Sequence, residues 1–302
     1  MITRDVGEFL RIARTLRADR LACAKALFLV APEGFALADE SARDNRYMDL
    51  TRPVDAERAL AQHRGLQRAL SARVPTICFA GDPATPDAVF PNNAFATAPG
   101  RLILGHMRHP VRQHETKRVD IRRFFTDTLG YQLHDLRDQP GVCELTGALV
   151  IDRARGLGFC GLSERCDETG AMAMHAAFDL RATLLFDLAP GEYHCNVVMS
   201  ALPGRGLALC SDGFADSAVP VALAELYASA VVELDSNEKS AFAGNCIAVT
   251  ADTVWMSEAA ADALTAQSRR SFERAGLALN AIALDEIEKA GGSLRCCIGE
   301  IY

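Results

Sequence analysis

The stretch Gly291-Gly292-Ser293-Leu294-Arg295-Cys296-Cys297-Ile298-Gly299-Glu300 lies near the end of this 302-residue sequence, and the rest of the chain is best interpreted from it. Its two leading glycines allow the backbone to bend tightly. The thiol of Cys296 follows at the start of an apolar run and directly after the basic residue Arg295. Because a neighbouring positive charge lowers the pKa of a thiol, and the thiolate is the reactive form, we interpret Cys296 as a nucleophile.

Polar residues recur at a nearly constant interval when the sequence is followed back from Cys296. Asn245, His194, Glu144 and Asn93 precede it, at successive intervals of 51, 51, 50 and 51 residues. Each of them stands just before an apolar segment with the composition of a strand. Four such intervals in series indicate an internal repeat, and equivalent positions in a ring of repeats face a common axis. The sequence therefore predicts that these five side chains meet.

Each repeat has the same expected order of elements: two strands joined by a tight turn, then a helix, then a third strand. The first copy has strands at 94–97 and 102–105 joined at Pro99-Gly100, a helix over about 114–128 and a strand at 132–136. The second copy has a hairpin at 148–152 and 157–161, a helix near 168–178 and a last strand at 183–187. The third has a hairpin at 197–202 and 207–209, a helix from Pro220 and a last strand at 231–234. The fourth has a hairpin at 246–249 and 254–257, a helix near 258–274 and a last strand at 278–284.

The fifth copy is split between the two ends of the chain. Its parts are a strand at 294–301 from the end of the sequence, with a strand at 26–30, a helix at 56–71 and a strand at 76–79 from its beginning. The last strand is therefore expected beside the first, and five ββαβ units are expected to close into a ring. The sequence thus predicts an α/β fold, namely a five-bladed α/β propeller with pseudo-fivefold symmetry.

Composition sets limits on the function. The chain is 49% hydrophobic, which is enough for a large core, and its net charge of -7 with a pI of about 5.6 argues against nucleic acid as a partner. No apolar run reaches the length of a membrane span, and the first residues lack the order of a secretion signal. Residues 1–302 are expected to form a single catalytic domain, with a helix over about residues 1–24 as an appendage.

The ten cysteines form no C-x-x-C pair, so a zinc knuckle is not expected. Most of them lie in apolar runs and are expected to be small buried residues in a reducing cytoplasm. No cluster of His, Asp and Glu has the spacing of a metal site. Neither a metal nor a cofactor is therefore expected.

A cysteine, a histidine and a glutamate at equivalent positions of the repeat form the parts of a covalent catalyst. Cys296 as a thiolate would attack an electrophilic carbon. His194 would protonate the leaving amine and then take a proton from the hydrolytic water, while Glu144 would orient the imidazole or contact a substrate nitrogen. Each residue alone could be a satisfied buried residue, but their shared register favours catalysis. Cys297 is a rival nucleophile that strand alternation places on the opposite face.

These residues carry a resemblance to the guanidine-modifying, or pentein, superfamily, which includes arginine deiminases, dimethylarginine hydrolases and amidinotransferases. The stretch at 85–93 resembles a P-D-x-V-F-x-E-D segment of the dimethylarginine hydrolases. Arg112-x-x-Glu115 and the G-x-S-x-R at 161–165 resemble superfamily motifs, and Gly292-x-x-Arg295-Cys296 resembles the deiminase nucleophile segment. The resemblance covers nearly the whole chain and implies the pentein fold.

The sequence is also similar to a bacterial amidinotransferase-like branch that includes citrulline hydrolases. It shares the pattern P-x-x-F…E-x-A-x-x-N in the segment 32–47, a long loop of the kind that often forms a lid. It also shares P-N-N at 91–93, H-x-N at 194–196, F-A-G-N at 242–245 and G-G-S-x-R-C…E-I at 291–301. This resemblance implies a small amino-acid substrate, a cytoplasmic location and, by family likeness, a homodimer.

The chain departs from the deiminases at two positions. Deiminases carry two aspartates that grip the guanidinium, and this sequence has Asn93 and Asn196 in their places. A buried guanidinium without carboxylate partners is strongly disfavoured, whereas an amide both donates and accepts hydrogen bonds and so suits a neutral ureido group. We therefore favour citrulline, which would give ornithine, carbon dioxide and ammonia through a thiocarbamoyl group on Cys296.

The resemblance also assigns substrate-binding residues. It implies that Arg112 and Arg165 bind the α-carboxylate of the substrate, and that Asp87 binds its α-amine. The alternative for Arg112 is a surface ion pair, and the alternative for Asp87 is a turn or helix cap. Asn245 is open to a purely structural role behind the site.

Other functions stay open at this point. The chain could be an arginine deiminase, a two-step arginine dihydrolase or a dimethylarginine hydrolase, in which Glu144, Glu115 or Asp87 supplies the negative charge. It could be an amidinotransferase, which shares the covalent step but admits an acceptor amine. It could also be a non-catalytic member that binds a partner, as a ribosome-binding translation factor of the superfamily does, but such a protein need not keep Cys, His and Glu in register.

Overall fold

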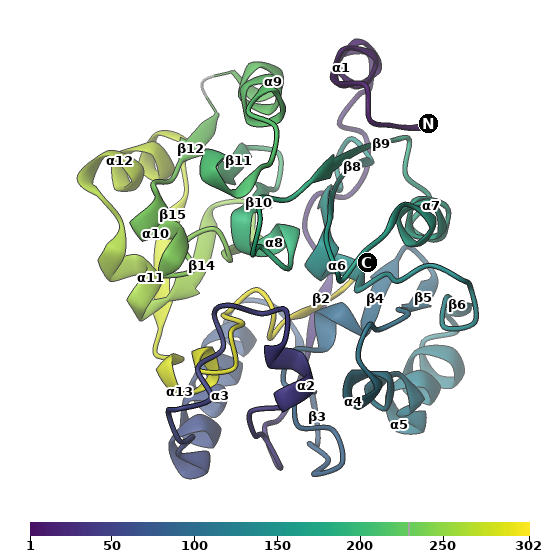
Figure 1. Cartoon of the computed structure of the whole chain (residues 1–302), viewed down its shortest axis with the longest axis vertical. Helices are drawn as coiled ribbons and strands as arrows, with labels where there is room; N and C mark the ends of the chain where they lie inside the picture. Colours follow the sequence, from purple (N-terminus) through teal and green to yellow (C-terminus); the bar gives the residue numbers. More distant parts are fainter. Residues whose placement is uncertain (229) are drawn as a thin grey trace.

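A computed structural model describes residues 1–228 and 230–302 as an α/β protein, with strands toward the middle and helices toward the outside (Figure 1). The strands of these residues form five separate sheets. The sheets contain β4 (Phe95–Ala98), β5 (Arg101–Leu104) and β6 (Gln132–Asp135); β1 (Ile2–Thr3), β7 (Leu149–Asp152), β8 (Leu157–Leu162) and β9 (Ala182–Asp187); β10 (Met199–Leu202), β11 (Gly206–Leu209) and β12 (Val231–Glu233); β13 (Ile247–Thr250), β14 (Thr253–Ser257) and β15 (Ala278–Ile282); and β16 (Gly299–Ile301), β2 (Ala26–Val30) and β3 (Thr76–Phe79).

Every sheet repeats one pattern of pairing. A first strand runs antiparallel to the second, and the second runs parallel to the third. The fifth sheet joins the two ends of the chain, because β16 pairs with β2 and places Gly299 opposite Phe28. The predicted α/β fold and its repeated unit are confirmed. Closure of the units into a propeller and the single-domain organisation stay predictions.

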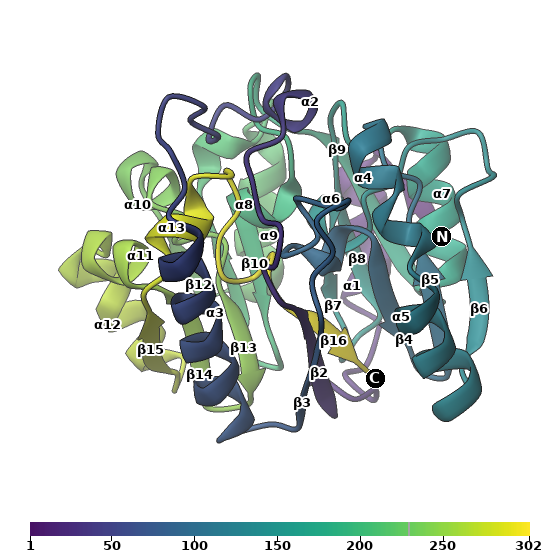
Figure 2. The ribbon, with the colours of Figure 1, turned by 90° about the horizontal axis from the view of Figure 1, so that it is seen from below.

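Helices follow the second strand of each unit and cover its outer side, and further short helices precede several first strands. Figure 2 shows α2, α6, α8 and α13 on the same side of β2, β3 and β16. The helices are α1 (Val6–Ala13), α2 (Asp39–Ala42), α3 (Ala56–Ser71), η1 (Pro91–Asn93), α4 (Pro110–Gln113), η2 (Glu115–Lys117), α5 (Val119–Arg123), η3 (Phe124–Thr128), α6 (Leu145–Ala148), α7 (Glu168–Ala177), α8 (Cys195–Val198), η4 (Ser211–Gly213), α9 (Ala218–Tyr227), α10 (Ser236–Ser240), α11 (Glu258–Ala263), α12 (Ala266–Arg274) and α13 (Asp285–Glu288).

Two predicted helices are divided in the structure. The helix expected over 114–128 is split into η2, α5 and η3, because Arg118 has a non-helical backbone with ψ of 106°. The helix expected over 258–274 is split into α11 and α12, because Leu264 is extended and the side chain of Thr265 caps the second helix. The helix expected from Pro220 begins at Ala218.

The strand expected over 294–301 is shorter than predicted. Only Gly299–Ile301 is extended, and the preceding residues form turns in which Cys296 N donates to Ser293 O at 3.0 Å. Strand alternation therefore does not separate Cys296 from Cys297, and that expectation from the sequence was wrong. Both cysteines belong to the same apolar core cluster and differ in their partners: Cys297 Sγ lies 3.6 Å from Ser293 O, whereas the amides of Asn245 and Asn196 approach Cys296 Sγ.

The beginning of the chain is also less helical than expected. The helix predicted over 1–24 is limited to α1, and the residues before it add the edge strand β1 to β9. Phe9 of α1 is fully buried, and its ring lies 5.9 Å from that of Phe159. This segment therefore contributes to the core of the second unit.

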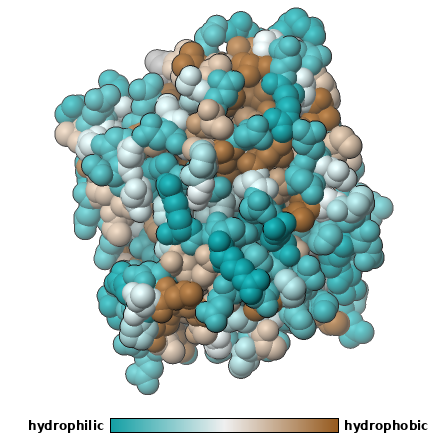
Figure 3. All heavy atoms as spheres, in the orientation of Figure 1, coloured by the Kyte–Doolittle hydropathy of each residue, from teal (hydrophilic) through white to brown (hydrophobic). Residues whose placement is uncertain are grey.

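The outer surface carries mainly polar side chains on the face shown in Figure 3, with an apolar area in its upper part. Within residues 1–228 and 230–302, no helix is long and apolar enough to cross a membrane.

Replacement of Phe28 by Ala is expected to destabilise the fold by about 3–5 kcal/mol, because the side chain is fully buried and its removal leaves a cavity. The ring packs against Phe79 and Phe125, at centroid distances of 6.2 and 5.3 Å. Chemical denaturation measures the loss. The control Val221→Ala, on a side chain that is 68% exposed, should change the stability by less than about 0.5 kcal/mol, and equal effects would contradict this account of the core.

Candidate active site

The five residues that recur at the repeat interval lie close together at the ends of the first strands of the sheets; we call them the register residues, and they are Asn93, Glu144, His194, Asn245 and Cys296. Glu144 and His194 are the residues directly before α6 and α8, and His194 Nε2 lies 2.9 Å from Glu144 Oε2. Asn245 Nδ2 donates to Cys296 Sγ at 3.3 Å. Asn93 ends η1 and lines a cavity together with Cys296. All five side chains are buried, so the positions that the repeat related in sequence are close in space.

Gly147 explains how two of these residues approach each other. A Cβ atom at this position would lie 2.5 Å from Asn93 Oδ1 and 2.8 Å from His194 Nδ1. Both distances are shorter than van der Waals contact, so only glycine fits without displacing the amide or the imidazole. In the sequence, Gly147 is visible only as a glycine three residues after Glu144. This spacing alone did not indicate that the glycine is needed at the site.

Glu144 and His194 form a polarised pair. Burial alone would raise the pKa of Glu144, but the charge of Arg165 and the hydrogen bond with His194 hold it well below its usual range. Burial lowers the pKa of His194, partly against the effect of Glu144. At neutral pH the imidazole is therefore neutral, its Nε2–H donates to the carboxylate, and the lone pair on Nδ1 is free to accept a proton.

Side-chain amides approach the sulfur atom of Cys296. Asn196 Nδ2 also approaches its Sγ, at 3.6 Å. Burial raises the pKa of the thiol above its ordinary value, and the bond from Asn245 and the charge of Arg295 offset only part of this. The sequence predicted that Arg295 would lower this pKa. Its influence has that sign, but burial has the larger effect.

The two arginines assigned to the substrate carboxylate are buried, so the surface alternative for Arg112 is wrong. Arg112 forms a bidentate ion pair with Glu115, with both distances 2.8 Å, and donates to Phe90 O. Arg165 Nη1 donates to Glu144 Oε2 at 3.1 Å, and its Nε donates to Asp44 Oδ1 at 2.9 Å.

Asp87 is also buried, at 2% exposure, and its Oδ2 accepts a 2.5 Å hydrogen bond from Ser41. Its other oxygen, Oδ1, has no partner among the described residues, and neither have Asn93 Oδ1 and His194 Nδ1. Buried polar atoms without partners are uncommon in native proteins. Asp87 and Asn93 line the same cavity as Cys296, so their unpaired oxygens are available to a bound molecule, whereas His194 is not among the residues that line this cavity.

This cavity is closed over by the loop that contains α2. It has a volume of about 20 Å³ and is lined by Ser41, Asn45, Met48, Asp87, Phe90, Asn93, Arg112, Arg165, Tyr193, Ala290, Gly292 and Cys296. Such a space holds about one water molecule and is too small for an amino acid. The predicted lid residue Asn45 holds the loop down by donating to Gly291 O at 3.3 Å.

Two residues of the loop were missed by the sequence-based prediction. Asp44 bridges Arg165 and His109, whose Nε2 lies 3.0 Å from Asp44 Oδ2, and Ser41 binds Asp87. The shared P-x-x-F…E-x-A-x-x-N pattern includes their neighbours, but nothing in the pattern showed that these two side chains face the site.

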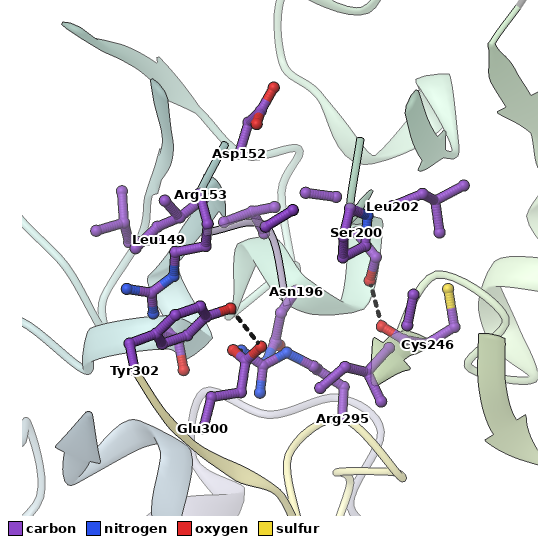
Figure 4. Close-up of a pocket in the computed structure, with 18 residues that line it drawn as sticks. Leu149, Asp152, Arg153, Asn196, Ser200, Leu202, Cys246, Arg295, Glu300 and Tyr302 are labelled. Atoms are coloured by element: carbon purple, nitrogen blue, oxygen red, sulfur yellow. Dashed lines mark hydrogen bonds and ion pairs between the residues drawn. The ribbon is translucent and has the colours of Figure 1, made fainter. Parts of the chain in front are cut away.

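A second cavity lies behind the nucleophile, on the other side of Asn196. Figure 4 shows Asn196 and Arg295 on its walls, with Glu300 and Tyr302 beside them. Its volume is about 40 Å³, which is room for two or three water molecules. Arg295 points into this region, where it pairs with Glu300 at 2.8 Å.

Comparison with known proteins identifies relatives of this chain. A family model described as N,N dimethylarginine dimethylhydrolase, eukaryotic, matches residues 31–302. The N(G),N(G)-dimethylarginine dimethylaminohydrolase of Mycobacterium tuberculosis (strain ATCC 25618 / H37Rv) is 27% identical over 264 residues, which cover 85% of this chain and 80% of that protein.

Solved structures show the same fold at lower identity. The substrate-bound N-terminal domain of ArgZ, an arginine dihydrolase from cyanobacteria, superposes with a TM-score of 0.78 at 19% identity, over 91% of this chain and 97% of that one. AgrE with ornithine and NAD+ gives 0.79 at 20% identity, over 92% of this chain but 39% of that one. A dimethylarginine dimethylaminohydrolase adduct gives 0.70 at 20% identity, over 92% and 99%.

The fold and the matches define a class, the hydrolases of non-peptide C–N bonds in the pentein superfamily. Within this class, the chain belongs to the N,N-dimethylarginine dimethylhydrolase family, whose model covers it from residue 31 to residue 302. The resemblance noted in the sequence is therefore confirmed. The individual roles of the site residues stay proposals.

Replacement of Gly147 by Ala is expected to reduce turnover by about 100-fold or more, because the added methyl group displaces His194 and Asn93 from their places. Steady-state kinetics and a thermal unfolding curve separate the loss of activity from a loss of fold. The control is Gly65→Ala in α3, where a Cβ meets no atom within 4 Å. Similar activity of both variants would contradict the role of Gly147.

The rate of Cys296 alkylation by iodoacetamide should keep rising with pH beyond the range in which an ordinary thiol ionises, because burial raises the pKa of this thiol and only the thiolate reacts. Mass spectrometry of the peptide that contains Cys296 measures the rate apart from the other cysteines. A plateau reached below pH 8 would show that the resting thiol is already ionised, contrary to the effect expected of its burial.

Proposed function

We propose that this chain hydrolyses the ureido group of a citrulline-like amino acid through a covalent intermediate on Cys296. The observation that carries the proposal is the amide surroundings of the sulfur, where Asn196 and Asn245 approach Sγ and Asn93 Oδ1 is left without a partner. A neutral ureido group offers N–H donors and a carbonyl acceptor that match such amides. Carboxylates, which a guanidinium prefers, do not contact the sulfur among the described residues.

The other end of the substrate would be held by buried charges. Arg112 and Arg165 line the cavity and would bind the α-carboxylate, as the superfamily resemblance implies. The free oxygen of Asp87 would accept from the α-amine. Both charged ends of an amino acid would thus have partners of opposite sign, and the uncharged ureido group would extend toward Cys296.

The reaction would proceed in two steps. The thiol proton passes to His194 Nδ1, and the thiolate adds to the ureido carbon. The C–N bond then breaks, the departing nitrogen takes the proton from His194, and a thiocarbamoyl group is left on Cys296. In the second step water gives a proton to Nδ1 and adds to the carbon, the C–S bond breaks, and the sulfur recovers the proton. Carbamic acid loses carbon dioxide, so the products are ornithine, ammonia and carbon dioxide.

Glu144 would keep the imidazole in the tautomer that this sequence of steps needs. Its bond to Nε2 holds the proton on that nitrogen and leaves Nδ1 as the acceptor. The same carboxylate would stabilise the imidazolium formed after each proton transfer. The 2.9 Å distance between the two side chains supports this role.

A second candidate is a guanidine hydrolase, in which the same site first converts arginine to citrulline. One observation favours it: the buried cluster holds the four carboxylates of Asp44, Asp87, Glu115 and Glu144 against two arginines, and a cationic substrate would offset the excess. The names of the relatives agree, because they include an arginine dihydrolase and a dimethylarginine dimethylaminohydrolase.

Purified protein incubated with citrulline is expected to release ornithine, and Cys296→Ala should lower the rate by about a thousandfold or more. The same assay with arginine decides between the candidates, since faster release of citrulline or ornithine from arginine would favour the guanidine hydrolase. Product that forms only when an acceptor amine is added would indicate an amidinotransferase. No turnover of any of these substrates above the Cys296→Ala background would reject the proposed function.

Asn93→Asp serves as a matched variant in the same experiment. It keeps the size of the side chain but replaces an N–H donor with a negative charge, so turnover of neutral citrulline should fall by about 10- to 100-fold. Reactivity toward the cation 2-chloroacetamidine should rise relative to neutral 2-chloroacetamide. A higher rate with citrulline would contradict the assignment of Asn93 to a ureido group.

A further inference from the structure

Asn245 contacts the reacting atom, although it stands outside the Cys-His-Glu set. Its Nδ2 lies 3.3 Å from Cys296 Sγ, compared with 3.6 Å for the Nδ2 of Asn196. The residue is fully buried. The sequence left a purely structural role open for Asn245. Its contact with the sulfur points instead to a role in the chemistry.

The orientation of the Asn245 amide is fixed by its other bonds. Its Oδ1 accepts from the backbone N–H groups of Arg295 and Cys296, at 3.1 and 3.4 Å. Its Nδ2 donates to Asn196 O at 2.9 Å. An amide turned by 180° would face two donors with its own N–H groups, so one hydrogen on Nδ2 is committed to Asn196 O and the second points to the sulfur.

The loop that carries Asn245 is held in place from behind. The hydroxyl of Ser200 contacts Gly244 O and Cys246 O, each at 2.7 Å, and Figure 4 shows the second of these contacts. Gly244 lies so close to the next unit that a Cβ there would be 2.3 Å from Val197 O. The amide is thus directed at the sulfur by a rigid support.

Arg295 does not donate a hydrogen bond to the sulfur of Cys296. Its guanidinium pairs with Glu300 at 2.8 Å and donates to Ile298 O at 2.9 Å, on the side of the second cavity. Much of its charge is therefore compensated by Glu300 rather than directed at the nucleophile. Among the described residues, no carboxylate or ammonium contacts the buried Sγ, and the hydrogen bonds from the two asparagine amides are the direct contacts that can stabilise its negative charge.

We propose that Asn245 is a catalytic residue that stabilises the thiolate of Cys296 through the hydrogen bond from its Nδ2. The bond strengthens when the sulfur becomes negative, which happens before attack and again when the C–S bond to the thiocarbamoyl group breaks. The two bonds accepted by Oδ1 meanwhile hold the backbone of the nucleophile in its turn. This inference rests on the proposed function, in which Cys296 is the nucleophile.

The test compares Asn245→Ala and Asn245→Asp with the wild type, in iodoacetamide alkylation of Cys296 and in turnover. Asn245→Ala removes the donor. Asn245→Asp keeps the size and an oxygen that accepts from both backbone N–H groups, but it places a negative charge beside the sulfur. Ser268→Ala is the control, because it removes a similarly buried polar side chain, which bonds Thr265 Oγ1 at 3.0 Å and Glu233 O at 3.4 Å, away from Asn245 and Cys296. Thermal unfolding of all four proteins measures the structural effect.

We expect the alkylation rate at pH 8 to fall about 10- to 100-fold in Asn245→Ala and further in Asn245→Asp. The pH midpoint of alkylation should move upward in the same order, and turnover should fall with it. Ser268→Ala should lower the melting temperature and leave the midpoint in place. Midpoints of both Asn245 variants within about 0.3 of the wild type, with turnover within twofold, would overturn the proposal. If Asn245→Ala does not fold, the same criterion applies to Asn245→Asp.

Failure of this inference can be told apart from failure of the proposed function. A wild-type protein that turns over citrulline or arginine, with Asn245 variants that do the same, removes only the role of Asn245. A shifted midpoint in the variants, together with no turnover of any ureido or guanidino substrate by the wild type, keeps the thiolate contact and removes the proposed reaction.

Discussion

The carboxylate of Glu144, completely removed from solvent, is the interaction on which the rest of the site depends. It accepts from His194 at 2.9 Å and from Arg165 at 3.1 Å, and the backbone N–H of Arg108 reaches it at 3.2 Å. A buried charge is tolerated only when it is paired and hydrogen-bonded. Loss of Arg165 would leave this buried charge unbalanced, and loss of the N–H of His194 or Arg108 would leave it short of a hydrogen bond, so the residues proposed for catalysis and for substrate binding share one centre.

The fold makes this centre possible by bringing repeated units together. Residues about 50 positions apart in the sequence become neighbours because each stands at the same end of an equivalent strand. The pairing of β16 with β2 matters most, since it brings the last unit and its cysteine back to the beginning of the chain. No local element supplies the site alone, because every unit contributes at least one side chain to it.

Much of the fold and part of the site could be predicted from the sequence. Strand periodicity and turn residues located the strands well, and the interval of the polar residues located the five that meet. The turn at 294–298 could not be predicted, because apolar composition does not distinguish a buried turn from a strand. Nor could the contacts of Asp44 and Ser41, since they form only when a loop closes on distant residues. The net effect of Arg295 on Cys296 depended on burial, which no neighbouring residue in the sequence reveals.

The ion pair between Asp44 and Arg165 links two events that are often treated separately. Asp44 belongs to the loop that covers the cavity, while Arg165 also binds the carboxylate that orients the imidazole. By thermodynamic linkage, whatever favours the closed loop also changes the electrostatic environment of the proton-transfer pair, and the reverse holds equally. The affinity for substrate and the protonation of the imidazole thus depend on the same equilibrium between the open and the closed loop. A substitution of Asp44 would therefore alter KM and the pH profile of the reaction together.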